Sequence, residues 1–152
     1  IRADCGMAPE ERDKRPLIVV VTKFDAWSQL ISLSKLELNW VMKRGTDGVV
    51  RLDVEQIRKL SDQLRKVIQN YCPEIVAAAD AFSEDVVFIP CSALGCSPTK
   101  REDGMLAVNP SDIRPSWAEV PMLYAIHRSI NGLITSTDAR GSKANVSRTR
   151  KE

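Results

Sequence analysis

The chain lacks long apolar runs, a strong charge imbalance and paired cysteine motifs. No apolar run approaches the roughly 20 residues that span a bilayer, and a net charge of +2 favours neither a nucleic acid nor an anionic membrane as partner. The four cysteines, Cys5, Cys72, Cys91 and Cys96, form no Cys-x-x-Cys pair, and His127 is the single histidine. We therefore expect no zinc site, and we predict reduced thiols in a cytoplasmic protein.

Two apolar runs predict buried strands. With 152 residues and 43% hydrophobic content, the chain can bury one domain-sized core. Residues Leu17–Val21 and residues 86–89 are continuous apolar runs rich in β-branched side chains, typical of parallel strands buried on both faces. Each run leads directly into polar residues. In open α/β sheets, ligands bind at that carboxyl end of the strands.

Helices are predicted between and after these strands. Asp53-Val54-Glu55-Gln56 resembles a capping box and opens an amphipathic helix that ends at Cys72, where Pro73 begins a second helix. Ser116-Trp117-Ala118-Glu119 predicts another capping box, with a helix continuing to Gly132 and His127 packed or at its surface.

Other segments leave alternatives open. Apolar spacing over residues 30–41 favours a helix, although residues 36–40 also alternate as in a short strand, and Gly45 and Gly48 mark a turn. Residues 96–116 exceed the usual connection length and suit either a lid-like insertion or a packed surface loop, with a small hairpin around Met105. We place one domain at residues 1–134, and a basic linker or disordered tail at residues 135–152.

The polar residues after the first strand are Thr22-Lys23-Phe24-Asp25. Guanine presents its N1–H and 2-amino group side by side, and one carboxylate can accept a hydrogen bond from both. Adenine has a lone pair at N1, so the same carboxylate would face an acceptor. In the P-loop GTPases, whose base-recognition motif this segment resembles, the aspartate reads guanine and the lysine stem lies along a face of the base, which implies these roles for Asp25 and Lys23.

This motif resembles the [Asn/Thr]-Lys-x-Asp motif of the P-loop GTPases, with Thr22 where many members carry Asn. Ser92-Ala93-Leu94 follows the second strand and resembles the other base-contacting motif of that family. The resemblance implies that backbone amides around Ser92, Ala93 and Leu94 face guanine O6 and that Leu94 packs on the base. Trp27 either covers the base or packs in the core, and core packing is favoured.

The resemblance covers residues 17–133 and implies the C-terminal half of a GTPase domain, with a partial doubly wound parallel sheet. The chain contains no Gly-x-x-x-x-Gly-Lys-[Ser/Thr]. We therefore expect a fragment whose parent, a large bacterial multidomain GTPase-like protein, binds GTP or GDP and hydrolyses GTP with Mg²⁺ held by an upstream half. This chain alone should be inactive, with guanine nucleotide and proteins as partners. The alternatives are a GTPase-like scaffold or interaction module without hydrolysis, and an unrelated flavodoxin-like domain that binds another ligand.

Overall fold

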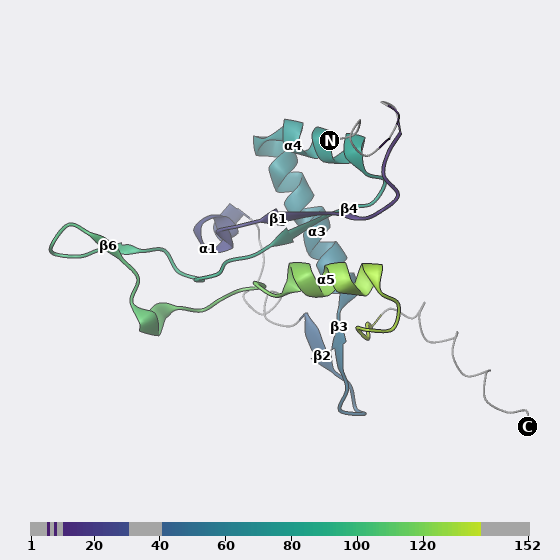
Figure 1. Ribbon diagram of the computed structural model, residues 1–152. Coiled ribbons are helices and arrows are strands. Elements are labelled where there is room, and N and C mark those ends of the chain that lie inside the picture. Colours follow the sequence, from purple (N-terminus) through teal and green to yellow (C-terminus); the bar gives the residue numbers. More distant parts are fainter. Residues whose placement is uncertain (1–5, 7, 9–10, 31–40, 138–152) are drawn as a thin grey trace, which may run out of the picture.

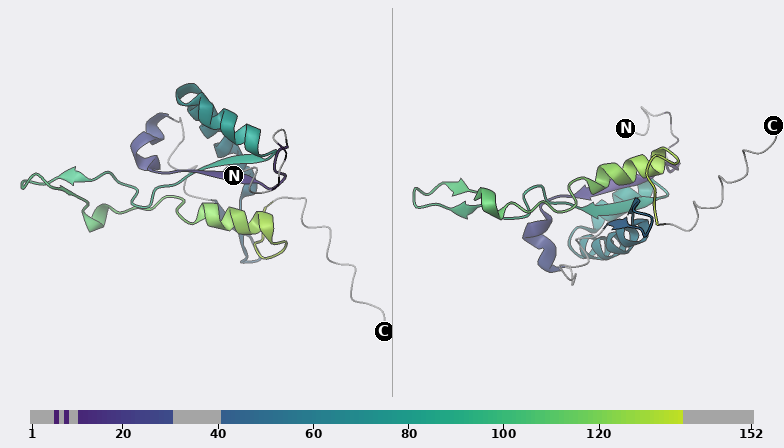
Figure 2. Two further views of the ribbon diagram at one scale, coloured as in Figure 1. Left: turned by 45° about the horizontal axis from the view of Figure 1, so that its top comes forward. Right: turned by 90° about the horizontal axis from the view of Figure 1, so that it is seen from below.

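The computed structural model describes residues 6, 8, 11–30 and 41–137. These residues form a mixed α/β fold, in which a parallel pair of strands lies between helices on its two faces (Figure 1). Helix α3 (Val54–Tyr71) packs behind the pair, and α5 (Val120–Ser129) covers the other face (Figure 2). None of the described helices is long and apolar enough to cross a membrane.

The parallel pair consists of β1 (Leu17–Val21) and β4 (Val86–Pro90), in a register that aligns Leu17 with Val86 and Val21 with Pro90. Both strands lie where the sequence predicts them. Burial on both faces is confirmed for β4, whose Phe88 and Ile89 are fully buried, and is wrong for β1, where Val20 is 43% exposed. Side chains project from the faces of a strand, so burial of Val20 depends on what packs on its face, which the apolar run alone does not specify; within the described residues β1 pairs only with β4.

The two predicted helices between the strands are confirmed. Asp53 caps α3 by accepting a hydrogen bond from the Gln56 amide at 3.1 Å, and α4 (Pro73–Phe82) begins with its proline in the first turn. Within α3, the buried Ser61 hydroxyl accepts a hydrogen bond from the Phe88 amide at 2.9 Å. This bond fixes α3 against the edge of β4 that faces away from β1.

The predicted capping box before α5 is wrong. The Ser116 backbone forms an isolated antiparallel bridge with Ser92, and Trp117 adopts a left-handed conformation with φ 54°. The helix therefore begins only at Val120, after Glu119 in the N-cap position without a side-chain capping bond. It ends at Ser129 rather than at Gly132. Burial of Trp117, which is 6% exposed, accompanies this late start.

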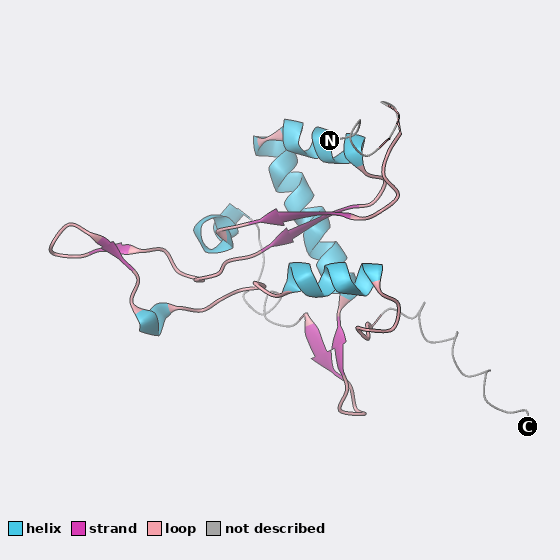
Figure 3. Cartoon of the chain, viewed as in Figure 1, coloured by secondary structure: helices cyan, strands magenta, loops and turns pink. Residues whose placement is uncertain are grey.

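A hairpin that the sequence indicated only by its turn lies below the parallel pair. Strands β2 (Met42–Arg44) and β3 (Val50–Leu52) are antiparallel, and the described strands form three separate pairs in all (Figure 3). Residues 135–137, assigned from sequence to the tail, pair with β3 through Leu52, which bonds Thr135 O at 2.8 Å and the Thr137 amide at 3.0 Å. Residues 31–40, which carry most of the expected helix or strand, and residues 138–152 lie outside the described residues.

Residues 96–113, here called the arm, project away from the helices and the parallel pair (Figures 1 and 2). The arm contains the two-residue strands β5 (Thr99–Lys100) and β6 (Leu106–Ala107), which confirm the expected hairpin, and a short helix η3 (Pro110–Asp112). It contributes no residue to the hydrophobic core, whereas residues 114–116 of the same loop bond to residues 92–94, so only that end of the loop is packed. The arm thus begins just after the carboxyl ends of β1 and β4, where the polar motif residues are expected.

Candidate functional site

The two motifs singled out in the sequence lie side by side. Pairing between β1 and β4 continues past their ends, because the Cys91 amide donates to Val21 O at 2.9 Å and the Phe24 amide donates to Cys91 O at 3.1 Å. Phe24 is buried at the start of the short helix α1 (Phe24–Trp27) and anchors it against the core. Asp25, the next residue, consequently sits beside the loop that follows β4.

Asp25 and Ser92 are in direct contact. The Ser92 hydroxyl donates a short hydrogen bond to Asp25 Oδ1 and accepts one from the Gly95 amide at 2.9 Å. Ser92 is 3% exposed and Asp25 is half-buried, so the bond between them is partly shielded from water. From the described residues, the second carboxylate oxygen, Oδ2, receives only a long 3.4 Å contact from the Ser97 hydroxyl. An ionised carboxylate has about four acceptor positions, so Asp25 is held in place and can still accept from a ligand.

The backbone amides of the loop after β4 are not all available, which corrects one expectation. The Ser92 amide donates to Ser116 O at 2.9 Å, so it cannot also serve a base. Ala93 and Leu94 are exposed, and in the described parts of the chain no group accepts a hydrogen bond from either of their amides. Two donors therefore remain next to Asp25, contributed by Ala93 and Leu94.

Backbone hydrogen bonds from residues 114–116 fix the loop that follows β4. The Arg114 amide donates to Leu94 O at 2.7 Å, and Ser116 exchanges two backbone bonds with Ser92. Gly95 has φ +67°, and a Cβ at this position would lie 1.6 Å from Arg114 O. Only glycine fits there, because a side chain would strain the backbone and collide with a carbonyl group. We call residues 92–95 together with residues 114–116 the neck.

The remaining members of the first motif are Thr22 and Lys23, both exposed. Lys23 has φ 54° and ψ 39°, a left-handed conformation that non-glycine residues rarely adopt. The Thr22 carbonyl accepts a hydrogen bond from the Trp27 indole at 2.8 Å. Trp27 is partly buried against the core, edge-to-face with Phe24 at 4.8 Å, which confirms core packing as its role.

Other reactive side chains do not converge on this site. Burial raises the pKa of the Cys91 thiol, which makes it a weaker nucleophile. His127 is partly buried, with Nδ1 3.3 Å from Ile134 O, in line with the prediction of a packed or surface histidine. Within the described residues, no three His, Cys, Asp or Glu side chains gather closely enough to hold a metal ion.

The site is an open surface at the strand ends, and two cavities lie elsewhere. One of about 610 Å³ lies by the amino end of β1, between Leu17 and Arg128, and one of about 340 Å³ lies on the arm. Sequence reasoning missed the neck and Ser97, because pairing between residues more than 20 positions apart in irregular segments leaves no periodic signal. Glycine at position 95 was the one hint in the sequence, because glycine often marks a position with positive φ.

The fold defines a mixed α/β protein with polar residues gathered at the carboxyl ends of two parallel strands. A scan against protein-family models found no match, and searches of curated proteins and of solved structures found no significant match to this chain.

Proposed function

We propose that this chain forms the base-recognition wall of a guanine-nucleotide-binding protein. The observation that carries the proposal is the junction of Asp25 with Ser92, which joins the ends of β1 and β4 beside two free amide donors. Guanine carries two adjacent donors, the N1–H and the 2-amino group, next to the O6 acceptor. A carboxylate beside amide donors therefore offers a partner to each of these groups.

The chemistry supports guanine over adenine on both sides of the junction. Asp25 offers only acceptors when ionised, and it would pair with the N1–H and the 2-amino group of guanine. The amides of Ala93 and Leu94 offer donors, which suit the guanine O6 acceptor and would clash electrostatically with the adenine 6-amino group. Lys23 and Leu94 contribute exposed apolar surface next to these groups, available for contact with the faces of the base.

The proposal assigns this chain base recognition and no hydrolysis. Its sequence has no phosphate-binding loop motif, so phosphate and Mg²⁺ contacts would come from a P-loop half that these residues do not supply. The doubly wound P-loop GTPase fold is part of the proposal, supported by the parallel pair and by the order of the two motifs. Base contacts alone should give a Kd on the order of millimolar.

The direct test is an NMR titration of the full chain with GMP, IMP, XMP and AMP, so that the phosphate group is the same in every arm. We expect GMP to shift the amides of Lys23, Ala93 and Leu94 and to bind more tightly than AMP. IMP lacks the 2-amino group, and loss of one charge-assisted bond should weaken binding about tenfold or more relative to GMP.

Asp25→Asn provides the matched variant. Its amide oxygen can still accept from Ser92, so the fold is retained, while its NH₂ group now faces the 2-amino group of guanine. Xanthine carries an oxygen at that position, so we expect the variant to lose GMP binding and to prefer XMP. Equal binding of GMP and AMP by the unchanged chain, or unaltered GMP binding by Asp25→Asn, would reject base recognition.

An interaction module without nucleotide binding is the second candidate. The observation favouring it is the exposure of Met105 and Leu106 on the arm, 67% and 70% respectively. The same titration separates the two candidates, because an interaction module without nucleotide binding would show no saturable shift with any of the four nucleotides.

A further inference from the structure

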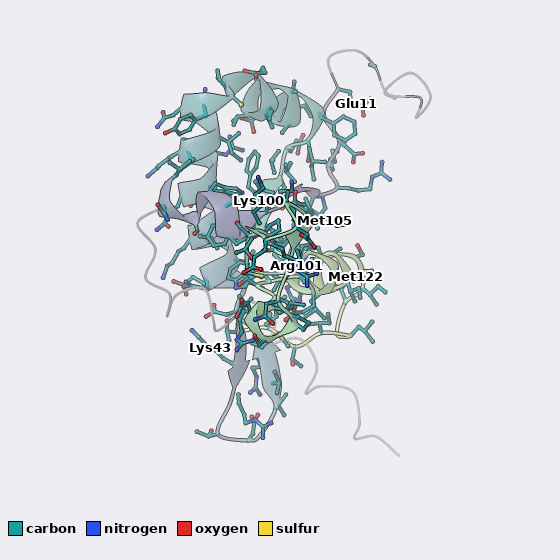
Figure 4. The ribbon with its side chains drawn as sticks, turned by 90° about the vertical axis from the view of Figure 1, so that its left-hand side faces the viewer. Glu11, Lys43, Lys100, Arg101, Met105 and Met122 are labelled. Atoms are coloured by element: carbon teal, nitrogen blue, oxygen red, sulfur yellow. The ribbon has the colours of Figure 1, made fainter. Side chains whose placement is uncertain are left out.

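Among the described residues, the arm is attached to the rest of the molecule only where it begins and ends. Its residues 97–106 are all exposed, and none of its side chains joins the core cluster. Figure 4 looks along the arm toward the body, with Lys100, Arg101 and Met105 nearest the viewer. The hairpin is held internally, for example by the Arg101 amide bonding Met105 O at 2.9 Å. The arm is therefore a stiffened extension whose position is decided by its attachment.

That attachment is the neck, which also carries the proposed base-reading groups. The free amides of Ala93 and Leu94 lie between Ser92 and Gly95, the two residues that contact Ser116 and Arg114 at the other root of the arm. Because a Cβ on Gly95 would overlap Arg114 O, the two sides of the neck are in tight contact. A rotation of the arm about its root must displace this loop, since close-packed contacts transmit small shifts rather than absorb them.

The arm also reaches the carboxylate directly. Ser97 is the second residue of the arm, and its hydroxyl lies 3.4 Å from Asp25 Oδ2. Both halves of the base-reading junction, the carboxylate on α1 and the amides after β4, therefore contact the root of the same extension. Met105 and Leu106 are exposed on the hairpin at its far end, where a second protein could hold it.

We propose that the arm is a regulatory lever of the guanine site, so that holding or displacing the arm changes base affinity. This inference rests on the proposed function. Coupling between two sites is reciprocal, so binding of guanine at the strand ends must in turn alter the arm. The lever acts through positioning of Asp25 and the two amides, and no arm residue is required to touch the base.

The first experiment measures the reciprocal effect in the full, unaltered chain. Order parameters from ¹⁵N relaxation are recorded for the amides of Lys100, Arg101 and Met105 with GMP, and with AMP as the control. We expect GMP to raise these order parameters, because a base bound to Asp25 and the loop restrains the neck. Unchanged values at a GMP concentration that saturates the amides of Ala93 and Leu94 would overturn the inference.

The second experiment shortens the lever by replacing residues 98–112 with Gly-Gly-Ser, which leaves Ser97 and Arg114 in place. We expect the ratio of GMP to AMP affinity to change by about fivefold or more, with an unchanged melting temperature because the arm adds nothing to the core. The matched control is Met105→Ser with Leu106→Ser, which alters the surface of the hairpin and should retain the ratio. A shortened variant with the original ratio would refute the lever.

The outcomes separate this inference from the proposed function. If the unaltered chain shows no preference for GMP over AMP, both fail. If that preference is present and the shortened variant retains it, the guanine site stands and the lever alone is wrong.

Discussion

Replacing Lys23 by glycine should stabilise the fold while weakening the site. Lys23 has φ 54° and ψ 39°, and for an L-residue this left-handed conformation costs about 1–2 kcal/mol. Glycine removes that cost but loses about 0.5–1 kcal/mol more backbone entropy on folding. The difference predicts a net gain of about 0–1.5 kcal/mol, with a midpoint of about 0.75 kcal/mol, because Lys23 lies at a loop position that glycine adopts freely.

The assay is thermal unfolding followed by circular dichroism. For a chain of this size, 1 kcal/mol corresponds to roughly 2–4 °C in Tm, so we expect Lys23→Gly to raise Tm by about 1–4 °C. Lys23→Ala is the matched control, because it removes the same side chain and retains the left-handed strain. Both variants should bind GMP less well than the unaltered chain, since the apolar stem is gone.

Lys23→Gly and Lys23→Ala lose the same side chain, and Lys23→Gly should have the higher Tm. If Lys23→Gly melts at or below the temperature of Lys23→Ala, the left-handed conformation is not strained and the argument fails. If Lys23→Gly is more stable and also binds GMP as well as before, the strain is real and the lysine stem has no part in base recognition.

Three further perturbations test other contacts. Ser92→Ala removes a hydroxyl that bonds two partly buried groups and should lower the free energy of unfolding in urea by about 1–3 kcal/mol, with Ser92→Thr closer to the original. Hydrogen bonding from Arg15 lowers the pKa of Asp13 from 3.8 to about 2. The ionised Asp13 therefore stabilises the fold above about pH 4 and loses that contribution as the pH falls toward 2. The urea midpoint of Asp13→Asn and of Arg15→Gln should therefore fall less than that of the unaltered chain between about pH 4 and pH 2. An equally large fall would contradict this prediction. Arg65→Lys keeps the charge but loses the two-bond fork to Asp80 and the guanidinium 5.4 Å above Phe88, so it should cost about 1 kcal/mol in the same urea assay; an unchanged midpoint would show that the fork adds nothing.

Local patterns predicted the regular elements well. The bounds of β1 and α4 follow from the apolar run and from Pro73, and the start of α3 follows from the Asp53 cap, because each is encoded within a few neighbouring residues. The same kind of pattern failed before α5, where the Ser116 backbone pairs with distant Ser92 and overrides the local capping signal. The exposure of Val20 was equally hidden, since it depends on which distant segments pack on that face of β1.

The candidate site divides in the same way. That Asp25 and Ser92 could meet was predictable, because parallel strands place their carboxyl ends at one edge of a sheet. Two other contacts depend on the position of the chain at the two ends of the arm. These are the hydrogen bond from the Ser92 amide to Ser116 O and the contact of Ser97 with Asp25. No periodicity or motif in residues 96–116 specifies those positions.

The bond between Asp25 and Ser92 joins residues 67 positions apart, and this separation has a kinetic consequence. Bringing the ends of such a segment together costs about 4 kcal/mol of chain entropy before any contact between them forms. The contacts within helices α3 and α4 are local, so these helices can form early. Strands β1 and β4 can pair only after the long loop between them has closed. We therefore expect the contact between Asp25 and Ser92 to form in the final step of folding. In the unliganded protein, the rate at which β1 and β4 separate should then set how long the site persists.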